Sequence, residues 1–167
     1  MNRKEIYDTL LQYDKKYNFK IEESDEVSIA KGNSYFSPDE KKMVVPSQSL
    51  IFESNDEEME LYYFSTFIHE HAHSTMIPLK RNPDITNLEE RAKEELVAEL
   101  TAYALATRAT DFSEKARKIL IAKNISYLSC WAKNAGITEP SNFTQIFNEC
   151  FRKSNEASEL LLKGGNE

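Results

Sequence analysis

The chain contains little of the residues that mark special classes of protein. Its 167 residues include four glycines, five prolines and two cysteines. With 40% hydrophobic and 29% charged residues, this composition excludes a fibrous or low-complexity chain and is typical of a globular protein. Cys130 and Cys150 stand alone without CxxC spacing, which excludes a zinc ribbon and a thiol redox motif and favours reduced, structural cysteines. A chain of this length is expected to form a single domain, over residues 1–167.

Basic patches and long apolar runs are also missing. The formal charge of −7 opposes a broad electrostatic grip on nucleic acid or on an anionic membrane, so we expect neither as a partner. No apolar stretch approaches the length of a membrane-spanning helix, and residues 1–20 lack the uninterrupted hydrophobic segment of a signal peptide. We therefore expect a cytoplasmic protein.

The order of the hydrophobic patterns predicts an α+β fold, with a small antiparallel or mixed sheet followed by a mostly helical C-terminal half. Alternating apolar residues predict strands, including one near Val27–Ile29 and a pair, Tyr35–Phe36 and Met43–Val45, that flank the turn SPDEKK. The expected elements are a helix at about 2–16, strands within about 19–50, helices at about 57–75 and 89–108, and further helices at 113–124, 125–134 and 142–163.

All three histidines of the chain lie in five consecutive positions, within the stretch FIHEHAHST. On a helix, residues four apart share a face, so His69 and His73 point to the same side and His71 does not. With Glu70 between them they form the pattern HExxH, in which the paired imidazoles can bind one Zn²⁺ and the glutamate can act on metal-bound water. The plainer alternative is a helix with surface histidines and a solvated glutamate.

A third ligand is needed to complete a catalytic zinc site. The segment EELVAE supplies carboxylates in the middle of a predicted helix, and Glu95 and Glu99 lie one turn apart on the same face, beside its apolar stripe. We expect Glu95 to be the third ligand and Glu99 to accept a hydrogen bond from the free ring nitrogen of a zinc-bound histidine. Glu94 can exchange roles with Glu95. The alternative for these glutamates is an exposed position on the helix surface.

Such a site hydrolyses amide bonds, so the expected substrate is a peptide or protein. Zinc acidifies its bound water and polarises the substrate carbonyl, while Glu70 acts as the general base and later returns the proton to the leaving amine. An additional donor to the developing oxyanion would help. Tyr103 lies two turns beyond Glu95 on nearly the same face, but a tyrosine on a helix is more often part of the core, and we assign it no role.

Four blocks occur along residues 20–163: SYFSPDEKKMVVPSQSLIF, YYFSTFIHEHAHST, RAKEELVAELTAYAL and ISYLSCWAK. In this order they resemble the zincin-like metallopeptidase domain of ArdC-type antirestriction proteins and of related phage and plasmid polyvalent proteins. The resemblance implies a zincin fold in which His69, His73 and a glutamate of EELVAE hold zinc and Glu70 is catalytic. It also implies that an edge strand near Val27–Phe36 pairs with the substrate backbone.

The chain departs from this family in three respects. ArdC proteins carry a separate domain that binds single-stranded DNA, and this chain has no room for one. Met76 replaces a glycine that commonly follows the zinc-binding helix, which affects how that helix ends. His71 stands where the family usually has an apolar residue. Because it shares a stripe with Phe64 and Phe67, we expect it to be half-buried or at a rim, pointing away from the metal.

Two functions of different classes follow from the sequence. The leading hypothesis is a zinc-dependent metallopeptidase that serves a phage, plasmid or other mobile element as an antirestriction or anti-defence protein. The alternative is a catalytically silent binding protein on the zincin scaffold that antagonises a host factor. The acidic balance and the absence of a basic, aromatic groove disfavour a nucleic-acid-binding module.

Overall fold

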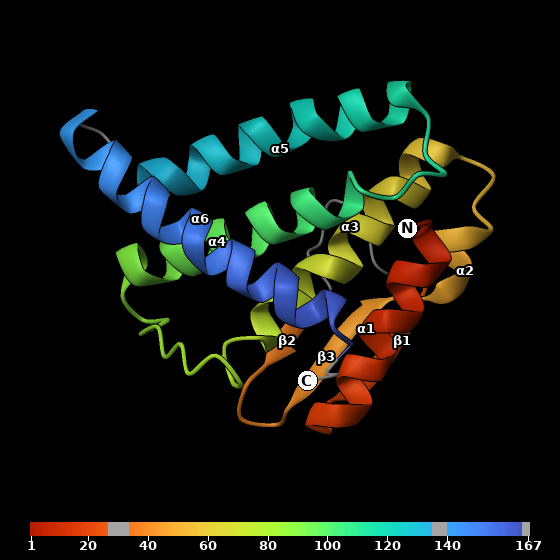
Figure 1. Cartoon of the computed structure of the whole chain (residues 1–167), viewed down its shortest axis with the longest axis horizontal. Coiled ribbons are helices and arrows are strands. Elements are labelled where there is room, and N and C mark those ends of the chain that lie inside the picture. The colour runs from red at the N-terminus through yellow and green to blue at the C-terminus, as the bar shows by residue number, and fades with distance from the viewer. Residues whose placement is uncertain (27–33, 135–139, 165–167) are drawn as a thin grey trace.

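The computed structural model describes residues 1–26, 34–134 and 140–164. A helix, a small sheet and then further helices follow one another along the chain, which confirms the predicted α+β class (Figure 1). The strand expected near Val27–Ile29 lies outside the described residues. The elements are α1 (Arg3–Tyr17), β1 (Lys20–Ser24), β2 (Tyr35–Ser37), β3 (Lys42–Pro46), α2 (Gln48–Phe52), α3 (Glu57–Ser74), α4 (Leu88–Ala106), α5 (Glu114–Asn134) and α6 (Pro140–Leu162).

The described strands form a mixed three-stranded sheet in the order β1-β3-β2. β2 and β3 pair antiparallel, with Phe36 opposite Met43, as expected for strands that flank the turn SPDEKK. β1 pairs with β3 in parallel, so β3 is central and β2 is an edge strand. Met43 and Val45 of β3 point to the same face of the sheet and are fully buried, because helices pack on that face.

Helix α3 packs on this sheet, and α4 lies against α3 (Figure 1). Asp56 caps the start of α3 by accepting hydrogen bonds from the amides of Glu58 and Met59, and no glycine or proline interrupts the helix up to Ser74. Asn87 caps α4 in the same way. The core that joins α1, the sheet and the long helices includes Ile6, Tyr7, Leu10, Met43, Val45, Phe64, Phe67, Ile68, Ala102, Leu105, Ala106 and Leu161.

Small residues on α4 allow it to approach α3 closely. Ala102 and Ala106 are fully buried in the main core, and they share a helix face with Glu95 and Glu99. The distance between packed helices depends on the side chains at the contact, so alanines bring the α4 backbone near its neighbour. This packing carries the glutamates of α4 to the histidine face of α3.

The structure of the C-terminal half differs from the prediction in one respect. The sequence patterns predict separate helices at 113–124 and 125–134, but the structure has the single helix α5. Asn124 resembles a helix boundary in the sequence because asparagine side chains often cap helix ends. Its amide is instead engaged with Glu99 of α4, and the backbone continues as a helix. Within the described segments, no helix combines the length and the hydropathy that a membrane span requires.

Candidate metal centre

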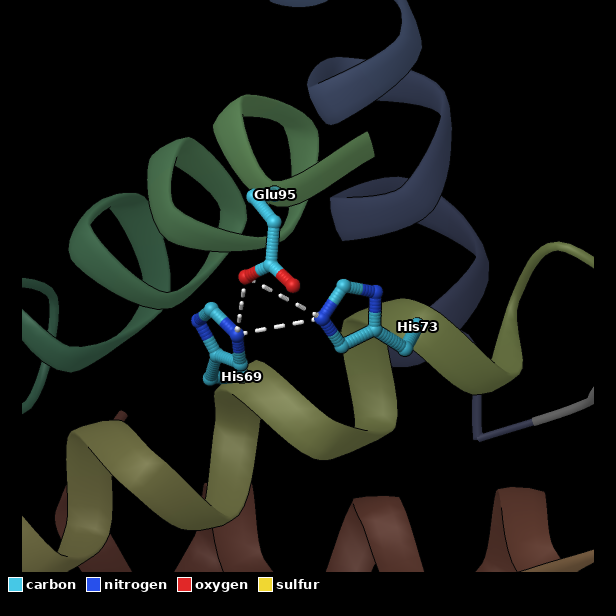
Figure 2. Close-up of side chains that lie close together, drawn as sticks. All are labelled: His69, His73 and Glu95. Atoms are coloured by element: carbon cyan, nitrogen blue, oxygen red, sulfur yellow. Dashed lines mark hydrogen bonds and ion pairs between the residues drawn. The ribbon is translucent and has the colours of Figure 1, made fainter. Parts of the chain in front are cut away.

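The two histidines predicted to share a helix face do so. His69 and His73 project from adjacent turns of α3, and their Nε2 atoms lie 3.1 Å apart (Figure 2). Glu95 of α4 reaches them from the opposite side, with its Oε2 atom 3.5 Å from Nε2 of His69 and 3.8 Å from Nε2 of His73. One ligand atom from each residue thus lies within 4.8 Å of the others.

The donor set fits a zinc ion. A tetrahedral zinc site with Zn–N and Zn–O bonds of about 2.0–2.1 Å has ligand atoms roughly 3.3 Å apart. The spacings of 3.1, 3.5 and 3.8 Å between the atoms of His69, His73 and Glu95 lie close to this value. Two imidazoles and one carboxylate are also the protein ligands of many catalytic zinc sites, in which a fourth position is left for water or substrate.

Glu99 contacts the ring nitrogen of His69 that faces away from the cluster. Its Oε2 atom lies 3.0 Å from Nδ1 of His69. Its Oε1 atom accepts a hydrogen bond of 3.0 Å from the amide of Asn124, in the amide orientation that also allows a bond to the carbonyl of Leu120. A carboxylate on Nδ1 holds the proton there and leaves Nε2 with its lone pair toward a metal. The sequence predicts that Glu99 contacts a histidine of the cluster without a choice between the two, and the structure places it against His69.

Glu94 occupies the corresponding place beside His73. Its Oε1 atom lies 3.5 Å from Nδ1 of His73, on the side of the ring away from Glu95. Its carboxylate also accepts two hydrogen bonds from Arg81, of 2.8 and 3.1 Å. Of the two glutamates between which the sequence left the choice open, Glu95 is the one that the structure brings to the Nε2 atoms.

Arg81 reaches Glu94 because of the way α3 ends. No glycine follows the helix, and Thr75 caps it in the right-handed conformation. The chain continues in turns until Lys80, which adopts a positive φ of 54°. The amide of Arg81, the next residue, donates a hydrogen bond of 2.8 Å to the carbonyl of Met76. This is the hydrogen bond of a C-terminal cap in which glycine usually takes the left-handed position that Lys80 has here. The Arg81 side chain then folds back and donates to the carbonyl of Ala72 at 3.2 Å.

The ionisable groups of the centre are arranged to hold positive charge. Burial lowers the pKa of His69 and of His73, but the carboxylates outweigh it. Glu95 and Glu99 raise the pKa of His69 well above its ordinary value, and Glu94 and Glu95 raise that of His73 to about 9. Burial opposes ionisation of Glu95, yet the two imidazoles hold its pKa below its ordinary value. A divalent cation bound by the same atoms would replace the protons that these pKa values retain.

Glu70 is buried beside the cluster, with 7% of its surface exposed. Its side chain makes no hydrogen bond to any residue in the described segments. Burial raises the pKa of Glu70 from its ordinary value, while His69 and His73 act in the opposite direction. A carboxyl group with a raised pKa and no fixed partner is suited to exchanging a proton with a bound molecule.

His71 points away from the cluster as predicted, but the expectation of a half-buried or rim position is wrong. The side chain is fully buried. Its Nδ1 atom lies 2.7 Å from the carbonyl oxygen of Phe67 and its Nε2 atom 3.0 Å from a carboxylate oxygen of Asp14 on α1. The ring is buried because a carboxylate on another helix compensates its polarity, and the positions of these two residues in the sequence gave no sign of that pairing.

Other residues around the centre were also missed. Arg81, Asn124 and Asp14 all act through contacts between elements far apart in the chain. Of these, only Arg81 left a signal, as a basic residue shortly after the HExxH helix. The expectation that both cysteines are structural is correct for Cys150, which is buried, and not for Cys130, which is exposed.

The fold and the cluster together define a class of protein. An HExxH helix on a small mixed sheet, joined by a glutamate from the next helix, is the arrangement of zincin metallopeptidases. The model of a zincin-like metallopeptidase family matches residues 18–134, which is more than half of the chain. The chain therefore belongs to the zincin-like metallopeptidase family. No curated protein and no solved structure matches it at a significant level.

Proposed function

We propose that this protein is a zinc-dependent peptidase, in which His69, His73 and Glu95 hold the zinc and Glu70 is the general base. One observation carries the proposal: three ligand atoms converge within 4.8 Å, and the buried carboxyl group of Glu70 beside them has no hydrogen-bond partner among the described residues. The exposed histidines of the plainer alternative do not fit this geometry. The contact of Glu99 with Nδ1 of His69, at 3.0 Å, supports its role in orienting that ligand.

The hydrolysis follows from these roles. Zinc, when bound, polarises a carbonyl group and acidifies water. Glu70 takes one proton from the attacking water, whose oxygen forms a bond to the carbonyl carbon. The C–N bond then breaks, and the proton held by Glu70 passes to the leaving nitrogen. The raised pKa of Glu70, caused first by burial, brings the group closer to the range in which it can both accept and return a proton.

The edge strand β2 is our candidate for holding the substrate. Its outer side has no partner strand in the described part of the sheet, and it contacts α3. An extended peptide can add to such an edge through backbone hydrogen bonds, which select a conformation and carry little sequence information. Residues 27–33 of the predicted edge region lie outside the described residues.

The substitution Glu70→Gln tests the mechanism. We expect the zinc-loaded variant to retain its zinc and fold but to lose about 100-fold or more of the cleavage rate on a peptide mixture analysed by mass spectrometry. Glu58→Gln is the matched control, since Glu58 lies in the first turn of the same helix with its side chain 37% exposed. Equal cleavage by the Glu70 variant, or no cleavage by the zinc-loaded wild type, would contradict the proposal.

The wider role rests on the resemblance to ArdC-type proteins. We propose that the substrate is a protein of a host defence system and that the chain acts as an anti-defence protein of a mobile element. Cells that express the wild type should protect incoming foreign DNA, and cells that express the Glu70→Gln variant should not. If the variant protects equally well, the chain acts as a catalytically silent binding protein on the zincin scaffold.

A further inference from the structure

Helix α5 packs against both α3 and α4, the two helices that carry the candidate metal ligands. Asn124, Tyr127 and Trp131 are spaced three and four residues apart, so they lie on one face of this helix. Asn124 is buried against Glu99. Tyr127 follows one turn later, and 44% of its surface is exposed.

The way in which α5 packs on α4 determines which residue of α4 lies opposite Tyr127. Two of the contacts between the helices fix their relative direction: Asn124 donates to Glu99 at 3.0 Å, and the Arg91 guanidinium lies 5.8 Å from the centroid of the Trp131 ring. These contacts show that the helices run antiparallel. Glu95 lies halfway between Arg91 and Glu99 on α4, and Tyr127 lies between Asn124 and Trp131 on α5. Tyr127 is therefore level with Glu95, the carboxylate of the cluster.

The electrostatics of Tyr127 agree with this placement. Burial raises the pKa of its phenol, Trp131 lowers it through a hydrogen bond, Glu95 and Glu99 raise it, and His69 lowers it. The Trp131 ring packs edge-on against the Tyr127 ring, with centroids 6.1 Å apart, and limits its orientations. The phenol thus lies within the field of the cluster, on a side chain that is 44% exposed to solvent.

We propose that Tyr127 is a further catalytic residue, whose hydroxyl donates a hydrogen bond to the carbonyl oxygen of the scissile amide. The inference rests on the proposed peptidase function. When water adds to the carbonyl carbon, the C=O π electrons move to the oxygen, and the Tyr127 O–H group stabilises that negative charge. Tyr127 keeps its proton throughout, because Glu70 alone carries the proton from water to the leaving nitrogen.

The test compares zinc-loaded wild type with Tyr127→Phe and with a matched control, Tyr17→Phe. Tyr17 lies at the end of α1, where its ring packs against the rings of Tyr13 and Phe19. The probe is N-phosphoryl-leucinamide, whose tetrahedral phosphoryl group imitates the tetrahedral carbon and its oxyanion. Binding is measured by isothermal titration calorimetry, with zinc content and thermal unfolding recorded for each protein.

We expect Tyr127→Phe to bind the probe at least tenfold more weakly than the wild type, while its zinc content and fold are unchanged and Tyr17→Phe binds normally. On a cleaved peptide, kcat should fall roughly 100-fold or more with little change in KM. Equal probe affinity in Tyr127→Phe and the wild type, loss of zinc from Tyr127→Phe, or no binding by the wild type would each overturn the inference. A third outcome is that the wild type binds the probe but cleaves no peptide, and that only Tyr127→Phe loses probe binding. This result would support Tyr127 as the donor and refute the peptidase function.

Discussion

The buried pair of His71 and Asp14 leads to a quantitative prediction about stability. The two side chains are 0% and 5% exposed, and they join α3 to α1 through a contact of 3.0 Å. The second carboxylate oxygen of Asp14 is buried and has no hydrogen-bond partner in the described structure. Removing His71 would therefore leave a carboxylate inside the protein with nothing to compensate its lost hydration.

The magnitude follows from the cost of an unpaired buried charge. Removal of one partner of a buried pair typically costs about 3–5 kcal/mol, whereas replacement of both partners by apolar residues of similar volume is often nearly neutral. We therefore expect His71→Leu and Asp14→Leu each to lower the free energy of unfolding by about 3 kcal/mol or more. The double variant should lose at least about 2 kcal/mol less than the sum of the two. Each single change would remove a large fraction of the roughly 5–15 kcal/mol by which native proteins are stable.

The assay is urea denaturation followed by circular dichroism, with a chelator present so that metal binding adds nothing to the stability. Asp8→Leu is the matched control, since Asp8 is on the same helix and its side chain is 48% exposed. It should change the free energy of unfolding by less than about 0.5 kcal/mol. Strictly additive effects of the two substitutions, or a cost below about 1 kcal/mol for His71→Leu, would refute this reasoning.

Three further predictions concern side-chain contacts of α4. Glu99→Gln should weaken zinc binding about 10- to 100-fold in a competition with a coloured chelator, and Glu89→Gln, at an exposed site on the same helix, should not. Arg81→Met removes the partner of a buried carboxylate and should lower the free energy of unfolding in urea by about 3 kcal/mol. Burial raises the pKa of the Cys150 thiol to about 11, so DTNB at about pH 8 should label Cys130 in the folded protein and Cys150 only after unfolding. Equal labelling rates in the folded state would contradict the observed packing of α6 on α4.

The helical period made the heart of the cluster predictable. His69 and His73 are four residues apart on a segment without glycine or proline, and Glu95 and Glu99 have the same spacing on another. Such spacing fixes which side chains share a face in any uninterrupted helix. It does not fix how two helices approach each other. The choice between Glu94 and Glu95 depends on the rotation of α4 against α3, which sequence reasoning could not supply.

The surrounding contacts were beyond the reach of local patterns for a related reason. Asn124 and Asp14 bond to residues 25 and 57 positions away. Judged from the local sequence, either residue could as well lie exposed on the surface of its helix. Because local patterns do not show tertiary contacts, the sequence also predicts two helices that meet at Asn124, where the structure has the single helix α5. A polar residue in the middle of a predicted helix indicates either a boundary or a buried partner, and only the packing of the neighbouring helices distinguishes the two.

The roles of the three histidines are distinguished by how their ring nitrogens are used. A neutral imidazole offers one donor and one acceptor, so a metal ligand needs one nitrogen without a fixed partner in the protein. His69 and His73 each meet a carboxylate on the Nδ1 side and direct Nε2 toward Glu95 and toward each other. His71 has both nitrogens in contact with the protein, at Phe67 and Asp14, and has none left to bind a metal. Its buried pair instead ties the HExxH helix to α1, so the middle histidine supports the helix on which the other two are presented.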